Sequence, residues 1–232
     1  VIRTPTLGWQ SVTNPSAATP GAPVESDVSL RERQQQSVAI PSLSVLQGAV
    51  ASVKSLTGVT SVNVVENDTN TTNADGVPAH SLAFVVAGGD NTQIATQIYK
   101  KKGPGAGTYG TTSVVVVDSF GTSNTIYFYR PTNSTISVSV TIKALTGYLS
   151  TIGDSLKQAI VDYINALNIG DDVLYTRLYL PAQLYGAADS KTYEVTSILI
   201  AVSPGTPVAA DISIPFYGKA QTALANLTLN VT

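Results

Sequence analysis

The stretch from Glu66 to Gly110 constrains the fold most closely, because clear loop, strand and helix signals follow one another in it. Its polar run Asn67–Gly76 has almost nothing to bury and therefore predicts a surface loop. The apolar run Ser81–Ala87 predicts a strand, which Gly88-Gly89 stops. Asp90 then predicts the N-cap of an amphipathic helix.

The helix is expected to end in the lysine triplet Lys100–Lys102, where the negative end of the helix dipole favours cations. Gly103-Pro104-Gly105 prevents its continuation. The β-branched run Thr111–Val117 predicts the next strand. This region therefore reads strand, helix, strand, with a polar loop and a glycine-rich loop exposed.

The whole chain predicts an α+β fold made of two small α+β units with mixed or antiparallel sheets, preceded by an extended N-terminal arm. The arm covers residues 1–22, whose prolines oppose both helix and central strand, or it is the remainder of a missing N-terminal region. Residues 23–130 are expected to form a helical hairpin plus an α+β domain, and residues 131–232 a C-terminal α+β domain. The boundary is placed at the polar segment Pro131–Ser134.

In the first unit, helices are predicted over residues 25–39 and, from the apolar spacing of residues 46, 50, 53 and 56, over a segment starting near Ser44 and ending before Gly58. Thr60–Glu66 is expected to be a strand. A turn at Gly121 should join Thr111–Val117 to a strand over Thr125–Arg130 as a hairpin.

In the second unit, clean alternation predicts a strand over residues 136–142 with one buried face. An amphipathic helix carrying residues 156–167 follows, and Thr151 with Asp154 suggests a capping box at its start. Further strands are expected over Asp172–Leu180, Tyr193–Val202 and Ala209–Ile214, and the tail from residue 220 to 232 is ambiguous.

The residues that could carry chemistry favour structural roles. His80 is the sole histidine, so a catalytic triad or a two-histidine zinc site cannot form within the chain, and we expect it at the start of a strand. The 71–82 segment fits an EF-hand loop poorly, because Leu82 stands where a bidentate Glu is required. The lysine triplet precedes its glycines, which is the reverse of a phosphate loop. Adjacent Asp171 and Asp172 are expected in turns or caps.

Composition narrows the function classes. A formal net charge of −2 gives no electrostatic footprint for nucleic acid, and no apolar run approaches the roughly 18 residues that cross a bilayer. The lack of cysteine removes disulfides and thiolate catalysis. The chain has no methionine and opens at Val1, so we expect it to be a piece of a longer polypeptide. Asn-X-Ser/Thr triplets occur at Asn67, Asn70, Asn133, Asn226 and Asn230, and chance is the preferred explanation.

Five segments in a fixed order then suggest a family. They are Pro23–Arg33, Glu66–Thr69, Gly88–Asp90, Gly105–Thr112 and the run GDDVLYTRLY over Gly170–Tyr179. From about Asn14 to Ile214 the chain resembles the baseplate J-like family of contractile-tailed phages and related contractile injection systems.

The resemblance implies a structural baseplate wedge component that takes part in baseplate ring assembly and in triggering tail contraction. It implies a place in the virion tail baseplate after assembly in the bacterial host cytoplasm, with other wedge proteins and copies of itself as partners. Catalytic residues, cofactors, metals, nucleic acid and membrane are not expected. A secreted glycan-binding or adhesin-like module is the alternative. Because the 25–39 helix has a thin apolar stripe, its exposed face is the candidate interface: Leu30, Arg31, Arg33, Gln34 and Val38.

Overall fold

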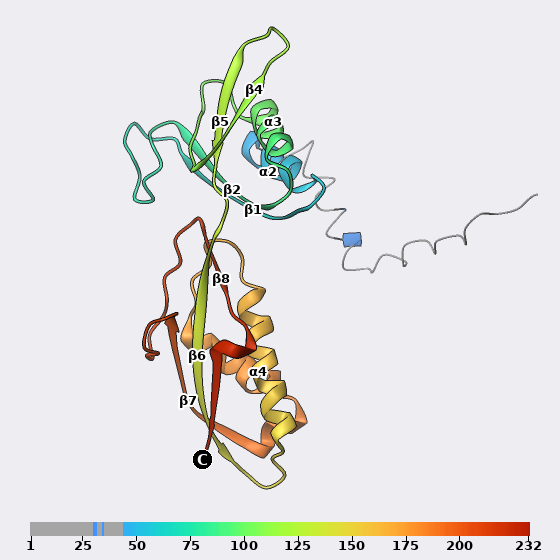
Figure 1. Ribbon diagram of the computed structural model, residues 1–232, viewed down its shortest axis with the longest axis vertical. Coiled ribbons are helices and arrows are strands. Elements are labelled where there is room, and N and C mark those ends of the chain that lie inside the picture. Colours follow the sequence, from blue (N-terminus) through green and yellow to red (C-terminus); the bar gives the residue numbers. More distant parts are fainter. Residues whose placement is uncertain (1–29, 32–33, 35–43) are drawn as a thin grey trace, which may run out of the picture. The chain divides into compact units, whose positions relative to one another are not determined.

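The computed structural model describes Leu30, Arg31, Gln34 and residues 44–232 (Figure 1). Residues 44–232 lie within one compact unit, and the α+β fold predicted for the chain is confirmed in them. The predicted arm over residues 1–22 and most of the predicted 25–39 helix lie outside the described residues. The three described residues of this predicted helix, Leu30, Arg31 and Gln34, are helical.

The first group of elements builds a helix-covered sheet and a β-ribbon. The sheet has the order β1-β2-β3, with β1 (Val59–Asn67) antiparallel to β2 (Ser81–Gly88) and β3 (Gly107–Thr108) parallel to β2. Helices α2 (Val45–Lys54) and α3 (Asn91–Lys101) share one hydrophobic cluster with this sheet. The cluster centres on fully buried Phe84, Ile94, Ile98 and Phe128.

The predicted hairpin is confirmed as a two-stranded ribbon of β4 (Thr112–Val117) and β5 (Ser123–Phe128). Asp118 closes the turn: its carboxylate accepts hydrogen bonds from the backbone amides of Phe120 and Thr122, at 2.9 Å each. Val116 and Ile126 of the ribbon are buried in the same cluster as β2. The ribbon therefore packs one face on the core.

The second group of elements surrounds the 13-residue strand β6 (Thr132–Ala144). On one side β6 pairs antiparallel with β7 (Tyr193–Val202), and on the other it pairs parallel with β8 (Gly218–Gln221) and β9 (Leu227–Val231). Helix α4 (Ser150–Asn165) packs its apolar face on this sheet (Figure 1). The buried alternation predicted for β6 is confirmed by four residues, each at most 1% exposed: Ile136, Val138, Val140 and Ile142.

Short helical turns complete the second group. They are η1 (Tyr175–Leu178), α5 (Tyr179–Ala182), η2 (Leu184–Gly186), η3 (Ala188–Thr192) and η4 (Leu224–Asn226). The strand predicted over Asp172–Leu180 is therefore wrong. Leu178 and Ala182, four residues apart, are both fully buried, so a helical spacing and not an alternating one satisfies the core here. Only Val173 makes a β-bridge, to Ile212.

The strand predicted over Ala209–Ile214 is also wrong. Besides the bridge of Ile212 to Val173, the amide of Ile214 donates to the Asp172 carboxylate at 2.7 Å instead of to a strand. Pro215 follows directly, and a proline cannot donate to a ladder. The ambiguous tail provides β9, which pairs with the centre of β6.

The polar segment Pro131–Ser134 is not a break between elements. β6 begins at Thr132, and residues 132–135 pair with residues 218–221 of β8. The side chains of Thr132 and Asn133 are exposed, so their polar character reflects solvent contact and not chain reversal. Each side of residue 131 has its own hydrophobic cluster, but the backbone continues almost directly from β5 into β6.

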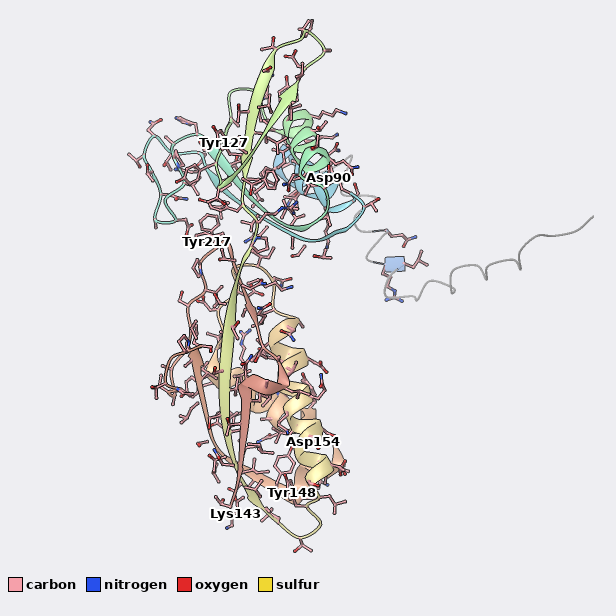
Figure 2. The ribbon with its side chains drawn as sticks, in the orientation of Figure 1. Asp90, Tyr127, Lys143, Tyr148, Asp154 and Tyr217 are labelled. Atoms are coloured by element: carbon pink, nitrogen blue, oxygen red, sulfur yellow. The ribbon has the colours of Figure 1, made fainter. Side chains whose placement is uncertain are left out.

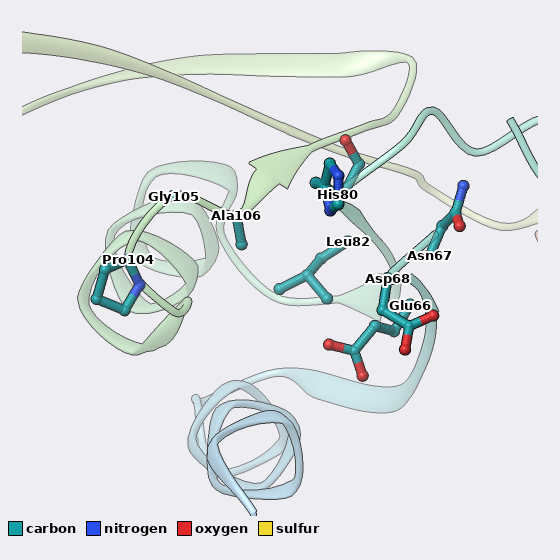
Figure 3. A pocket seen from close by; sticks show the side chains of 9 residues that line it. Glu66, Asn67, Asp68, His80, Leu82, Pro104, Gly105 and Ala106 are labelled. Atoms are coloured by element: carbon teal, nitrogen blue, oxygen red, sulfur yellow. The ribbon is translucent and has the colours of Figure 1, made fainter. Parts of the chain in front are cut away.

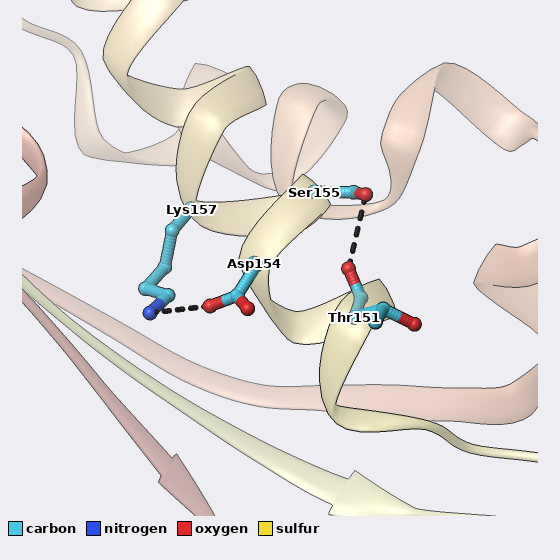
Figure 4. Close-up of polar contacts among 4 residues, drawn as sticks. All are labelled: Thr151, Asp154, Ser155 and Lys157. Carbon is cyan, nitrogen blue, oxygen red and sulfur yellow. Dashed lines mark hydrogen bonds and ion pairs between the residues drawn. The ribbon is translucent and has the colours of Figure 1, made fainter.

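The predicted capping box at Thr151 and Asp154 is wrong, because α4 begins at Ser150 with Leu149 at the cap position and no side-chain cap. Thr151 therefore lies inside the first turn, where its carbonyl accepts from the Ser155 hydroxyl at 3.1 Å (Figure 4). Asp154 pairs with Lys157 at 2.8 Å. The side chains of Thr151 and Asp154 both lie on the exposed face of the helix.

No helix in the part of the chain that the structure describes is both long and apolar enough to cross a membrane.

Candidate functional site

A hollow in the first group of elements lies where β1 ends and β2 begins, and it has a volume of about 310 Å³. The glycine-rich loop after α3 forms its far wall (Figure 3). Its lining includes the titratable residues Glu66, Asp68 and His80, beside the polar Asn67 and Ser81. The sequence placed Glu66 at the end of one strand, Asp68 in a polar loop and His80 at the start of another strand. The antiparallel pairing of β1 with β2 brings the three together.

The groups in this hollow do not converge on one point. His80 directs its Nε2 to the side-chain oxygen of Asn70 at 2.8 Å. In Figure 3 the carboxylates of Glu66 and Asp68 point away from the His80 ring. Among residues 44–232, no group of three or more histidine, cysteine, aspartate or glutamate side chains could hold a metal ion. His80 lies directly before β2, as predicted.

Asn67 holds the polar loop closed beside the hollow and is the exception in a run expected to have almost nothing to bury. Asn67 is only 3% exposed. Its amide nitrogen donates to the carbonyls of Thr71, Val77 and Pro78 at 2.7, 2.8 and 3.1 Å, and its oxygen accepts from Thr69. A saturated, buried amide also cannot carry a glycan in the folded chain.

Gly88, Gly89 and Asp90 form a tight connection between β2 and α3. A Cβ on Gly88 would lie 2.1 Å from the carbonyl oxygen of Gly58, and both glycines have positive φ values. Only glycine fits here without strain. The Asp90 carboxylate caps α3 by accepting from the amides of Thr92 and Gln93, each at 3.0 Å, as predicted (Figure 2).

Arg130 locks this connection to the end of β5. Its Nη1 donates to the carbonyl of Val86 at 2.9 Å, and its Nη2 donates to the carbonyl of Gly89 at 2.9 Å. Further contacts go to the carbonyl of Gly88 and the side chain of Asn91. Burial lowers the pKa of the guanidinium, and the nearby Asp90 opposes that change. Its donors therefore serve the fold and are not free to bind an anion.

The glycine-rich segment Gly105–Thr112 is likewise a packing element. A Cβ on Gly110 would lie 2.1 Å from the backbone of Phe128, and one on Gly107 would lie 2.6 Å from the Ser81 hydroxyl. The lysine triplet ends α3 as predicted, and Lys102 directs its ammonium to the carbonyl of Ala106 at 2.9 Å. The loop that follows α3 therefore holds the Lys102 ammonium with its own backbone carbonyl.

The C-terminal motif is anchored in the same way. Gly170 has a φ of +84°, and a Cβ there would lie 3.2 Å from both the Asn63 amide and the Phe216 carbonyl. Asp171 accepts from the backbone and side chain of Asn168 at 2.9 and 3.1 Å. The predicted turn role is confirmed for Asp171 and is wrong for Asp172, whose carboxylate accepts from the distant amide of Ile214.

An aromatic cluster lies where the chain passes from β5 to β6. Tyr129 stacks on Tyr217 with ring centres 5.2 Å apart, and it meets Tyr109 and Phe216 edge-on at 6.0 and 5.4 Å. Burial raises the pKa of Tyr129, and the neighbouring Tyr109 adds to the effect. No periodic pattern in the sequence indicates this cluster, because its members come from three separate loops.

The candidate interface predicted from the sequence is only partly described. Leu30 is half-buried, whereas Arg31 and Gln34 are exposed; Arg33 and Val38 lie outside the described residues. A second exposed surface, which sequence reasoning missed, is the outer side of the β4–β5 ribbon. Its apolar side chains have large exposed fractions: Val117 61%, Val115 58% and Tyr127 42%. Phe120, in the turn that joins the two strands, is 92% exposed.

Compared with known proteins, the chain matches no protein-family model and no curated protein. The family resemblance therefore stays a prediction, and function has to be argued from the residues themselves.

Proposed function

We propose that this chain is a structural wedge component of a contractile phage tail baseplate, which takes part in ring assembly and in triggering contraction. It works through the shape and chemistry of its surfaces, and its partners are other wedge proteins and copies of itself.

The proposal is supported by the structural role of the five sequence segments on which the family resemblance depends. Four of the five lie in the described part of the chain, and each fixes a backbone connection: Asn67 closes a loop, Gly88 and Gly89 allow a close approach, Gly110 packs on β5 and Gly170 turns the chain. Motifs that hold a fold in this way are what a family of assembly proteins would share. A catalytic motif would instead aim polar groups into a common space.

The exposed apolar side chains of the β4–β5 ribbon add support of a different kind. An apolar patch on a protein surface is typical of a region that contacts another macromolecule. Such a patch suits a subunit that is buried in a larger assembly.

The proposal is tested by co-expressing the full chain with the products of the genes beside its own, followed by affinity capture and mass spectrometry. We expect at least one neighbouring tail protein to be retained in a fixed ratio. The matched control is the same chain with Gly110→Val, which disrupts the packing on Phe128 and should lose the partner. Capture of no tail protein by the folded chain would refute the proposal.

A further inference from the structure

Strand β4 has one unpaired side among the described residues. It pairs only with β5, in a register that places Val115 opposite Thr125 and Val117 opposite Ser123. The end of the ribbon extends beyond α3 (Figure 1). One long edge of β4 is thus open to another strand.

The ladder shows which backbone groups point to that open side. The amide of Asp118 donates to the carbonyl of Thr122, and the amide of Tyr127 donates to the Thr108 hydroxyl and not to β4. Hydrogen-bonded and non-hydrogen-bonded pairs alternate in an antiparallel ladder. Residues 112, 114 and 116 therefore use their N–H and C=O groups on β5, and residues 113, 115 and 117 direct theirs outward.

The side chains along this edge offer no protection against pairing. The run from Thr111 to Val117 contains no charge, no proline and no glycine, and four of its seven residues are valine. Natural proteins commonly guard an exposed edge with lysine, proline or a bulge. Val115 and Val117, more than half exposed, are instead strand-forming residues that gain from burial.

We propose that β4 pairs antiparallel with β4 of a second copy of this chain, about a two-fold axis at Val115, to make a four-stranded sheet from two ribbons. The partner strand must be uncharged and β-branched, and must present outward-facing groups at alternate residues. Strand β4 itself meets each requirement, and a strand that is its own complement gives the isologous contact of a two-fold dimer.

The two-fold register also keeps like charges apart. With Val115 facing its own copy, Ser113 faces Val117 and Asp118 faces Thr112. The two Asp118 carboxylates are then six residues apart along the strands, or roughly 20 Å. The shared edge is one short strand, so we expect a dimer that forms in a concentration-dependent way. This pairing does not depend on the proposed function.

Cysteine crosslinking tests the geometry directly, because the chain contains no cysteine of its own. Facing residues of a hydrogen-bonded antiparallel pair have Cα atoms about 5.5 Å apart, within the range that a disulfide spans. Val115→Cys should therefore give a disulfide-linked dimer of twice 24.1 kDa under mild oxidation.

The matched control is Thr125→Cys. Thr125 is also exposed and lies directly across the ribbon from Val115, but it is one strand further from the edge. Two copies of it would be about 14 Å apart, three strand spacings, which is too far for a disulfide. We expect Val115→Cys to crosslink at least tenfold faster. Equal rates, or no crosslinking of Val115→Cys, would overturn the proposal.

Sedimentation equilibrium of the unmodified chain gives an independent measurement. We expect a reversible monomer–dimer equilibrium, weakened at least tenfold by Val115→Lys, which sets two ammonium groups face to face, and little changed by Thr125→Lys. A wild-type chain that stays monomeric at about 100 μM would overturn the proposal. If Val115→Lys does not fold, as judged by circular dichroism, the crosslinking rates decide the question.

Discussion

Replacing Arg130 by methionine tests whether the Gly88–Asp90 connection is held by this one side chain. Methionine keeps much of the apolar stem over Phe128, whose ring centre lies 5.4 Å from the guanidinium carbon, and removes every donor. The carbonyls of Val86 and Gly89 then lose their partners. The substitution therefore isolates the hydrogen bonds from the packing.

The expected loss follows from the geometry. A hydrogen bond to a charged group contributes about 1.5–3 kcal/mol, and Arg130 makes several. Arg130 is only half-buried, so water can replace part of the set. We therefore expect a net loss of about 2–3 kcal/mol in the free energy of unfolding, or roughly 5–10 °C in Tm for a domain of this size.

The assay is urea unfolding followed by circular dichroism, with Arg177→Met as the matched control. Arg177 is exposed, so its replacement should change the free energy of unfolding by no more than about 0.5 kcal/mol. Arg130→Lys should recover less than half of the loss, since an ammonium cannot reproduce the planar fork. If Arg130→Met is as stable as Arg177→Met, the assignment of Arg130 to the fold is refuted.

Three further predictions concern other residues. Burial raises the pKa of Tyr193 from 10.0 to about 12, so its contribution to stability is complete below pH 10 and is lost between pH 10 and 12, at about 1.4 kcal/mol per pH unit. Tyr193→Phe should therefore reduce the fall in the free energy of unfolding over this pH range. An unchanged dependence on pH would show that Tyr193 does not cause it. Asn67→Asp should lower the free energy of unfolding, measured in urea, by about 2–3 kcal/mol because a carboxylate would face three carbonyls. The control Asn133→Asp changes an exposed residue and should have almost no effect. Similar stabilities of the two variants would contradict the buried role of Asn67. Gly110→Ala should lower Tm by roughly 6 °C or more, because the added methyl group would clash with β5. Gly103→Ala should not lower Tm, because no atom lies within 4 Å of the added group. Equal melting temperatures would show that the Gly105–Thr112 segment is not closely packed.

Local periodicity was enough to predict most of the elements. The i, i+4 spacing of apolar residues identified α2 and α4, and alternation identified β6, because each buries one face of a regular structure. Asp90 was predicted correctly as a helix cap, and Ser44, expected near a helix start, caps α2, because capping depends on residues within one turn.

The errors have a common physical origin in pairing partners that are distant in sequence. Thr132 begins a strand because Gly218 lies beside it, and the two-residue strand β3 exists only against β2. Over residues 172–180 the same apolar residues fit an alternating or a helical spacing, and the buried pair Leu178 and Ala182 decided for the helix. No local pattern distinguishes these cases.

The candidate site was less predictable than the fold. Asn67 sits in a run of polar residues, and only the closed loop shows that its amide is buried. Three acceptors of Arg130 are backbone carbonyls 41 to 44 residues earlier in the chain, which carry no sequence signature. One edge of β4 is open because no strand among the described residues pairs with it on that side. No local sequence pattern shows that such a partner is missing.

The central claim, that this chain is a wedge component of a contractile tail, is tested most directly by locating it in intact particles. Contractile particles would be purified from the organism that encodes the chain and labelled with gold-conjugated antibodies raised against residues 44–232. We predict label at the baseplate end of the tail, and loss of complete baseplates when the gene is deleted. Intact, contraction-competent tails without the chain would contradict the claim.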